Sequence, residues 1–182
     1  MPGLEVKVSD MAAGSHGERH EKRFARWQAR VNPKTRFLSE LVQAELVPVI
    51  AAEGLGRVDT ALEGEGRTLN PNEIRLERVG GNYIDSIGIT FGKYGRARFQ
   101  ISASRRERAA PHAWIRATHL VKHAGQYYCF WGKPGWLPSP LWPDALAKRT
   151  VNTVSKLVRQ LTVFLETGER GPNLSRPSTD RG

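Results

Sequence analysis

Cysteine is almost absent from the sequence, since Cys129 is the only one among 182 residues. A single cysteine excludes an internal disulfide and a zinc site built from several thiolates. Long apolar runs are absent too, because no stretch approaches the length of about twenty residues that a helix needs to cross a bilayer. The N-terminal segment lacks the apolar centre of a secretion signal. We therefore expect a cytoplasmic protein that has no membrane partner.

Acidic residues are scarce relative to basic ones. The sequence has 18 Asp or Glu against 28 Lys or Arg, which gives a formal net charge of +10, and its pI is about 10.3. Such a balance favours a polyanionic partner, which would be nucleic acid, a phosphate-rich ligand or an acidic protein surface. Composition alone supports equally well the alternative that the host's proteins are generally rich in arginine.

The positive charge is concentrated between Lys93 and Lys133, where nine Lys or Arg stand against one acidic residue, a surplus of eight. In the run RARFQISASRRER, basic and polar residues occupy alternate positions: Arg96, Arg98, Gln100, Ser102, Ser104, Arg106 and Arg108. The other series begins with apolar residues: Ala97, Phe99, Ile101 and Ala103. Side chains alternate across a strand, and unpaired buried charge is costly. The pattern predicts a strand with one apolar face and one cationic face exposed to solvent.

Helical periodicity predicts three helices. The first is expected from Glu18 to about Val31, with a basic stripe and an apolar stripe on different sides. The basic stripe consists of Arg19, Lys22, Arg23, Arg26 and Arg30, and the apolar stripe of His20, Phe24, Trp27 and Val31. The second is expected from Thr35, as its N-cap, to residue 52, kinked or restarted at Pro48. The third is expected at about 144–167.

Short alternating segments predict an antiparallel sheet. Strands are expected at 74–79, 83–91, from 96 onward, 114–121 and 126–131, and 105–111 is expected to be a charged connector. Because consecutive strands usually pair, we predict an α+β fold: a meander of four or five strands, packed on one face by the N-terminal helices and a long C-terminal helix. One domain is expected at 18–168, between a flexible arm at 1–17 and a disordered tail at 169–182.

Catalytic and metal-binding signals are weak. His119 and His123 have a spacing that suits a metal ion only on a helix, and no acidic cluster accompanies them. Cys129 lies in an apolar run, where a cysteine is usually inert. A glycine-rich phosphate loop and paired carboxylates are missing. We therefore expect a protein that is not an enzyme and that needs no cofactor or metal.

Binding signals are stronger. Phosphate contacts are predicted on and beside the cationic strand face, from Lys93, Arg96, Arg98, Gln100, Arg106, Arg108 and Arg116. Aromatic residues that could stack on bases lie nearby, at Tyr94, Trp114 and Tyr127. The basic stripe of the first helix is a second candidate surface. The alternative is a module that binds an acidic protein through Trp136 and Trp142 of a Pro-rich segment, although such tryptophans more often fix a loop to the core.

The segment 41–54 reads LVQAELVPVIAAEG, which is a helix pattern with a late proline and a closing glycine, and the predicted strands at 84–91 and 98–104 follow it. This order resembles a group of small uncharacterised bacterial domains. Some similar small α+β proteins are immunity or partner-binding proteins. Such domains commonly lack an assigned activity, and the resemblance implies no catalytic residues.

Overall fold

A six-stranded antiparallel sheet forms the centre of the computed structural model, which describes residues 13–58, 69–92, 97–110, 114–121, 130–131 and 143–175. Its first five strands follow sequence order: β1 (Gly56–Val58), β2 (Glu73–Val79), β3 (Tyr83–Phe91), β4 (Arg98–Glu107) and β5 (Trp114–His119). The sixth, β6 (Phe130–Trp131), also pairs with β4. The helices are α1 (Ala13–Arg30), α2 (Pro33–Leu41), η1 (Val42–Leu46), α3 (Val47–Ala52), α4 (Pro143–Ser155) and α5 (Val158–Thr167).

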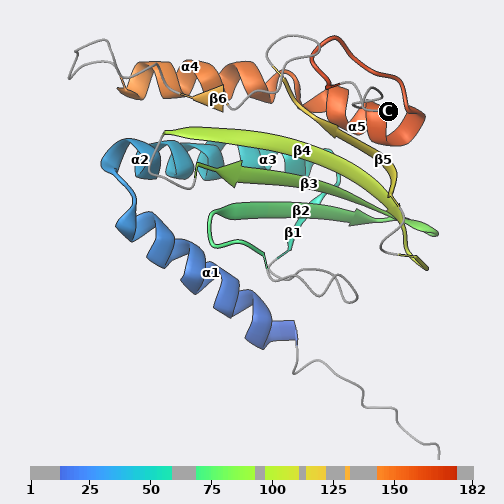
Figure 1. Ribbon diagram of the computed structural model, residues 1–182, viewed down its shortest axis with the longest axis horizontal. Helices are drawn as coiled ribbons and strands as arrows, with labels where there is room; N and C mark the ends of the chain where they lie inside the picture. Colours follow the sequence, from blue (N-terminus) through green and yellow to red (C-terminus); the bar gives the residue numbers. More distant parts are fainter. Residues whose placement is uncertain are drawn as a thin grey trace, which may run out of the picture.

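The predicted fold class, an α+β meander with helices packed on one sheet face, is confirmed. Figure 1 shows α2 and α3 behind the strands, α4 and α5 on the β4–β5 side, and α1 running obliquely past β2. The core consists of rows of apolar residues that are adjacent in register, such as Ile74, Ile89 and Ile101, all with no exposed surface. These residues alternate with polar ones along each strand, so one sheet face is apolar and faces the helices.

Helix α2 begins three residues earlier than expected. Its N-cap is Asn32, whose Oδ1 accepts a hydrogen bond of 2.8 Å from the backbone N–H of Thr35. The prediction of Thr35 as N-cap is therefore wrong, and Thr35 is fully buried inside the helix. Pro33 stands in the first turn, where its missing N–H breaks no helical bond.

The α-helix restarts at Pro48, as predicted: Pro48 stands in the first turn of α3, and a turn of π-helix, η1, precedes it. The ring of a proline inside an α-helix clashes with the carbonyl four residues earlier, and its nitrogen donates no hydrogen bond. The wider π-turn relieves this conflict. The helix then continues as α3 and ends at Gly54, which has φ of 83°.

The C-terminal region differs from the expected single helix and disordered tail. The helix is divided at Lys156–Leu157 into α4 and α5. Beyond it, residues 169–175 pack against β5: Leu174 is buried and forms a bridge with Leu120, and the N–H of Ser175 donates to the carbonyl of His119 at 2.9 Å. The prediction of a disordered tail is wrong for 169–175, because an apolar side chain enters the core there and backbone groups of the sheet edge gain partners.

Strand β4 is longer than expected, and two strands, β5 and β6, pair with it along one edge. It continues to Glu107, so the predicted charged connector at 105–111 is wrong for its first three residues. Strand β5 pairs with positions 102–106 of β4 and has a bulge between Arg105 and Arg106. Strand β6 pairs with Arg98 and Phe99, which lie beyond the end of β5, rather than with β5 itself.

Candidate functional site

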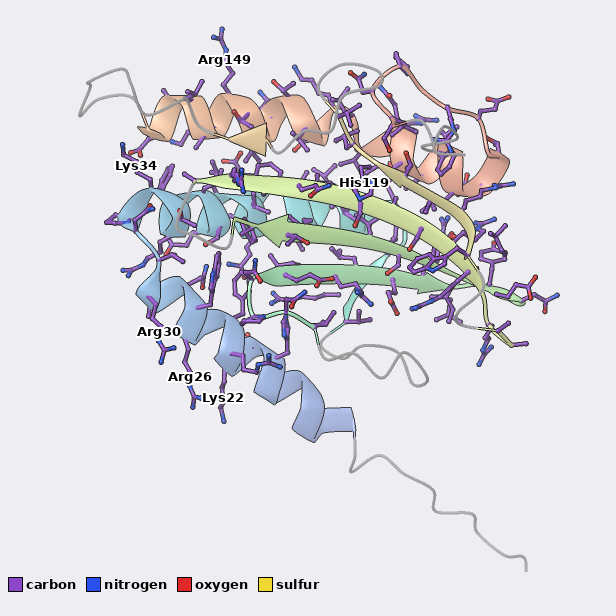
Figure 2. All side chains as sticks on the ribbon, in the orientation of Figure 1. Lys22, Arg26, Arg30, Lys34, His119 and Arg149 are labelled. Carbon is purple, nitrogen blue, oxygen red and sulfur yellow. The ribbon has the colours of Figure 1, made fainter. Side chains whose placement is uncertain are left out.

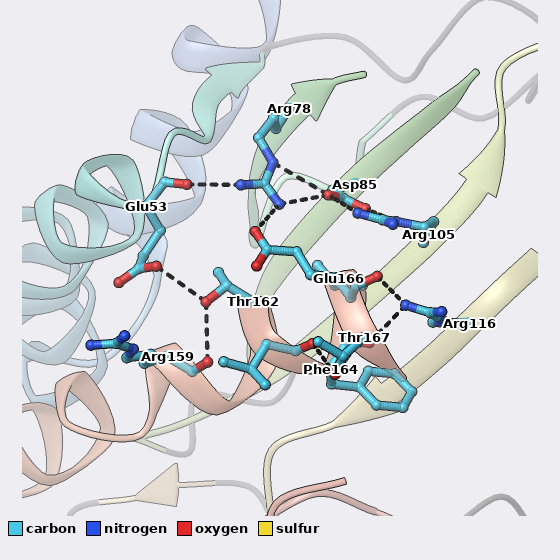
Figure 3. A network of polar contacts seen from close by, with 12 residues as sticks. Glu53, Arg78, Asp85, Arg105, Arg116, Arg159, Thr162, Phe164, Glu166 and Thr167 are labelled. Carbon is cyan, nitrogen blue, oxygen red and sulfur yellow. Dashed lines mark hydrogen bonds and ion pairs between the residues drawn. The ribbon is translucent and has the colours of Figure 1, made fainter. Parts of the chain in front are cut away.

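A cluster of ion pairs occupies one end of the helix-covered sheet face. Asp85 of β3 has no exposed surface and lies between Arg78 of β2 and Arg105 of β4 in the register. Its carboxylate accepts two hydrogen bonds from Arg105, at 2.6 and 2.8 Å, and two from Arg78, at 2.8 and 3.3 Å (Figure 3). The Arg105 guanidinium also lies 3.7 Å from the centre of the Tyr83 ring. This cluster ties three strands together.

Helix α5 closes the same cluster. Arg78 bonds Glu166 at 3.0 Å, and Arg116 of β5 donates to the carbonyl of Leu165 at 2.6 Å (Figure 3). The last carbonyls of a helix carry partial negative charge and attract cations. The prediction that Arg116 flanks an open cationic face is therefore wrong, since its guanidinium binds the end of α5. Hydrogen bonding to Asp85 raises the pKa values of Arg78 and Arg105, so both stay charged.

The opposite sheet face carries the predicted polar series, but Arg106 of that series is buried. Arg106 keeps only 1% of its surface accessible, and its Nη2 lies 3.1 Å from Oε1 of Glu77. Ser86 donates to the same oxygen at 3.0 Å. The prediction of a solvent-exposed Arg106 is wrong because a carboxylate from β2, two strands away, neutralises its charge.

Glutamates and an arginine of β2 share this face and were missed as site residues. Glu73, Arg75 and Glu77 alternate with Ile74 and Leu76, and this alternation in the sequence could have indicated a charged face. Arg75 Nη2 lies 3.1 Å from Glu73 Oε1.

A cavity of about 350 Å³ lies over this polar face. Its lining includes charged side chains, serines, small residues and, from β5, a tryptophan and a histidine: Glu73, Arg75, Arg106, Ser86, Ser102, Ser104, Gly88, Ala103, Ala117, Thr118, Trp114 and His119. Gly88 lies in the register between Arg75 and Ser102, and a Cβ there would lie 3.1 Å from the Ser102 hydroxyl. The lack of a side chain at 88 therefore keeps the middle of this face hollow. Trp114, with 59% of its surface exposed, is the large aromatic residue of the lining.

His119 is a neutral member of the cavity wall at pH 7. Burial lowers its pKa below the ordinary value of 6.5. The unfolded chain therefore binds this proton more readily than the folded protein does, and stability is lost as the pH falls below about 6.5. We expect His119→Gln to lose less stability than the parent protein between about pH 7.5 and 5.5. Urea unfolding at both pH values measures this difference, and equal losses in the two proteins would contradict it.

The basic stripe of α1 lies on a solvent-facing side of the molecule. Phe24 and Trp27 fix the helix, with ring centres 6.0 and 5.4 Å from that of Phe91. Lys22, Arg26 and Arg30 are exposed and extend away from the sheet, as does Lys34 at the start of α2 (Figure 2). Neither Arg26 nor Arg30 forms an ion pair with any residue that the structure describes. We call Lys22, Arg26 and Arg30 the α1 ridge.

The α1 ridge and the cavity are connected through β2. The ring of His20, on α1, lies with its Nε2 3.0 Å from the backbone carbonyl of Glu73. The carboxylate of Glu73 lines the cavity. The helix that carries the ridge therefore contacts the backbone of one residue that lines the cavity.

The remaining residues predicted to bind phosphate or a protein partner differ in their exposure, and some lie outside the described residues. Arg98 and Gln100 are half-buried on the polar face of β4, and the Nε2 of Gln100 is buried with no hydrogen-bond partner among the described residues. Arg108 is exposed just after β4, and Arg23 is half-buried on α1. The side chain of Arg19 lies outside the described part of the structure, as do four complete residues: Lys93, Arg96, Trp136 and Trp142.

The described residues limit the possible chemistry in two respects. No group of three or more His, Cys, Asp or Glu there is placed to hold a metal ion. None of the helices there combines the length and the apolar character needed to cross a bilayer. Comparisons of the chain with protein families, curated proteins and solved structures give no match, so the resemblance to small bacterial domains stays a prediction.

Proposed function

We propose that this protein is a non-enzymatic nucleic-acid-binding protein and that the α1 ridge makes its main phosphate contacts. The observation that carries the proposal is the contrast between two sets of arginines. Arg78, Arg105 and Arg106 of the sheet are bonded to carboxylates. Arg26 and Arg30 of α1 are exposed and have no carboxylate partner in the described ranges. Free cations on a surface are the groups that exchange counterions with a phosphate backbone.

The spacing of the ridge supports this proposal. Lys22, Arg26 and Arg30 follow one another at intervals of four residues, so they lie on one side of the helix about 6 Å apart. Arginine and lysine side chains at this spacing present a continuous positive strip to a polyanion. Arg98, half-buried on the polar face of β4, adds a further cation outside the ridge.

A charge-reversed double variant tests the proposal. We expect Arg26→Glu/Arg30→Glu to weaken binding of a labelled oligonucleotide about a hundredfold at low salt, because two phosphate contacts become repulsions. The slope of log K against log salt between about 50 and 200 mM should decrease in magnitude by about 1.4–1.8. Fluorescence anisotropy titrations at several salt concentrations give both quantities.

The matched control is Lys148→Glu/Arg149→Glu, which makes the same change of net charge at two exposed positions of α4. Figure 2 places Arg149 on the opposite side of the molecule from the α1 ridge. Equal losses in the two variants would mean that net charge rather than the ridge governs binding. No binding by the parent protein at about 50 mM salt would refute the proposal.

An acidic protein partner is the competing proposal, and exposed apolar residues favour it. Trp114 and Ile115 of β5 have 59% and 48% of their surfaces exposed, and tryptophan is common at protein–protein hot spots. A single protein captured by the parent chain and not displaced by excess oligonucleotide would support this alternative. Displacement by oligonucleotide and by heparin would support the nucleic-acid proposal.

A further inference from the structure

We infer that the cavity on the polar sheet face takes one unpaired nucleobase, so that the protein prefers single-stranded to double-stranded nucleic acid. This inference rests on the proposed nucleic-acid binding and adds the part of the ligand that the α1 ridge does not contact. The ridge would contact phosphates, and the cavity, on the sheet face opposite the one that α1 packs against, would take one base.

The volume of the cavity fits a small ring system. At about 350 Å³ it lies in the range of small-ligand sites. Its floor is formed by Gly88 and by serines of β3 and β4, which leave room above the sheet. A base inside a duplex is stacked and paired, and therefore unable to enter such a hollow, whereas a base of a single strand is free to turn into it.

The charges of the lining favour an uncharged ring over a phosphate. Each of the two guanidinium groups in the lining already faces a carboxylate: Arg75 lies 3.1 Å from Glu73, and Arg106 lies 3.1 Å from Glu77. A phosphate requires cations that are not already neutralised. A base edge instead offers donors and acceptors side by side, and the carboxylate, guanidinium and hydroxyl groups here can match both kinds.

Aromatic groups of β5 supply stacking surfaces. Trp114 is exposed and lines the cavity, and base stacking on such a ring requires no particular base. His119 lines the same cavity, and a neutral imidazole stacks on bases or hydrogen-bonds them without adding charge. The site therefore combines stacking with hydrogen bonding and predicts little sequence preference.

Helix α1 and the cavity share one residue of β2. His20 of α1 contacts the backbone of Glu73, and Glu73 lines the cavity.

An abasic oligonucleotide separates the cavity from the ridge. It keeps the phosphates and lacks the bases, so we expect the full-length protein to bind it about tenfold more weakly than a base-bearing strand of the same length. Trp114→Ala should show the same loss on the base-bearing strand and no loss on the abasic strand, and Trp114→Phe should restore most of the affinity. Circular dichroism of each variant checks folding. Ser104→Met, which fills the cavity from its floor, is the second variant.

The outcomes are distinguishable. Equal affinity of the parent protein for abasic and base-bearing strands would overturn the cavity inference and leave the ridge proposal intact. No binding of either strand would overturn the proposed function, and the base site with it. Competition by an uncharged nucleoside against the base-bearing strand only would support the site and show that it also accepts free nucleosides. Tighter binding of a duplex than of a single strand would overturn the inference.

Discussion

Replacing Asp85 by Asn is expected to lower the free energy of unfolding by about 3–5 kcal/mol. Asp85 has no exposed surface, and its carboxylate accepts four hydrogen bonds from Arg78 and Arg105 at 2.6–3.3 Å. Removing its charge leaves the largely buried guanidinium of Arg105 without the anion that offsets its desolvation. Urea unfolding at pH 7 measures the change, provided that the slope with denaturant stays the same.

Glu166→Gln is the matched control for this prediction. Glu166 binds the same Arg78 guanidinium at 3.0 Å, but 52% of its side chain is exposed. Exposed ion pairs usually contribute about 0–1 kcal/mol, because water already solvates both charges. If Asp85→Asn and Glu166→Gln cost the same, burial does not determine the strength of this cluster, and the argument from desolvation is wrong.

The sheet was predictable from the sequence because its core strands alternate cleanly. Ile87, Ile89 and Phe91 on one strand and Phe99 and Ile101 on the next repeat with period two, and all are buried on the face that the helices cover. A period of two can be produced by a strand and by no helix. The order of β1 to β5 followed as well, since short connections favour neighbours, whereas β6 pairs with β4 rather than with β5.

The burial of Arg105 and Arg106 and their pairing with carboxylates were not predictable from the same alternating pattern. Arg105 and Arg106 are consecutive, so their side chains point to opposite faces of β4. Each is neutralised by a carboxylate that lies at least 20 residues away in sequence, Asp85 for Arg105 and Glu77 for Arg106. The rule that arginine avoids the interior holds for unpaired charge, and only the register of three strands reveals the partner.

The site was predictable only in part for a related reason. The basic stripe of α1 follows from helical spacing within one segment, and its exposed members have the positions expected of it. The cavity instead combines residues of β2, β3, β4 and β5. Its Glu73 and Arg75 alternate visibly in the sequence, but their proximity to Ser102 depends on long-range strand pairing.

The ion pairs of the sheet determine where the net charge acts. Glutamates and an aspartate within the sheet and α5 neutralise most of its described arginines: Glu73, Glu77, Asp85 and Glu166. Within the described ranges the exposed cations then lie mainly on helices, and among them the α1 ridge has regular spacing. This distribution is the physical reason for placing the phosphate contacts on α1 rather than on the strand with the most arginines.

The Glu77–Arg106 pair provides the second large expected effect. Glu77→Ala removes the acceptor of both Arg106 and Ser86, and we expect it to lower the free energy of unfolding by about 3–5 kcal/mol, because both partners are buried. The double variant Glu77→Leu/Arg106→Met removes both charges and replaces them with apolar groups of similar size. Its stability should lie within about 1–2 kcal/mol of the parent protein or exceed it. A double variant as unstable as Glu77→Ala would show that the cost comes from packing rather than from charge.

The pH dependence of the double variant tests the electrostatic origin of this effect. Burial raises the pKa of Glu77 above its ordinary value of 4.5, although the hydrogen bond from Ser86 and the charge of Arg106 act in the opposite direction. The folded protein then holds this proton more tightly than the unfolded chain does. The contribution of Glu77 to stability is full below about pH 4.5 and is lost as the pH rises through the raised value. The double variant lacks this loss, so its stability relative to the parent protein should increase between about pH 4 and 7, and a constant difference would contradict the assignment.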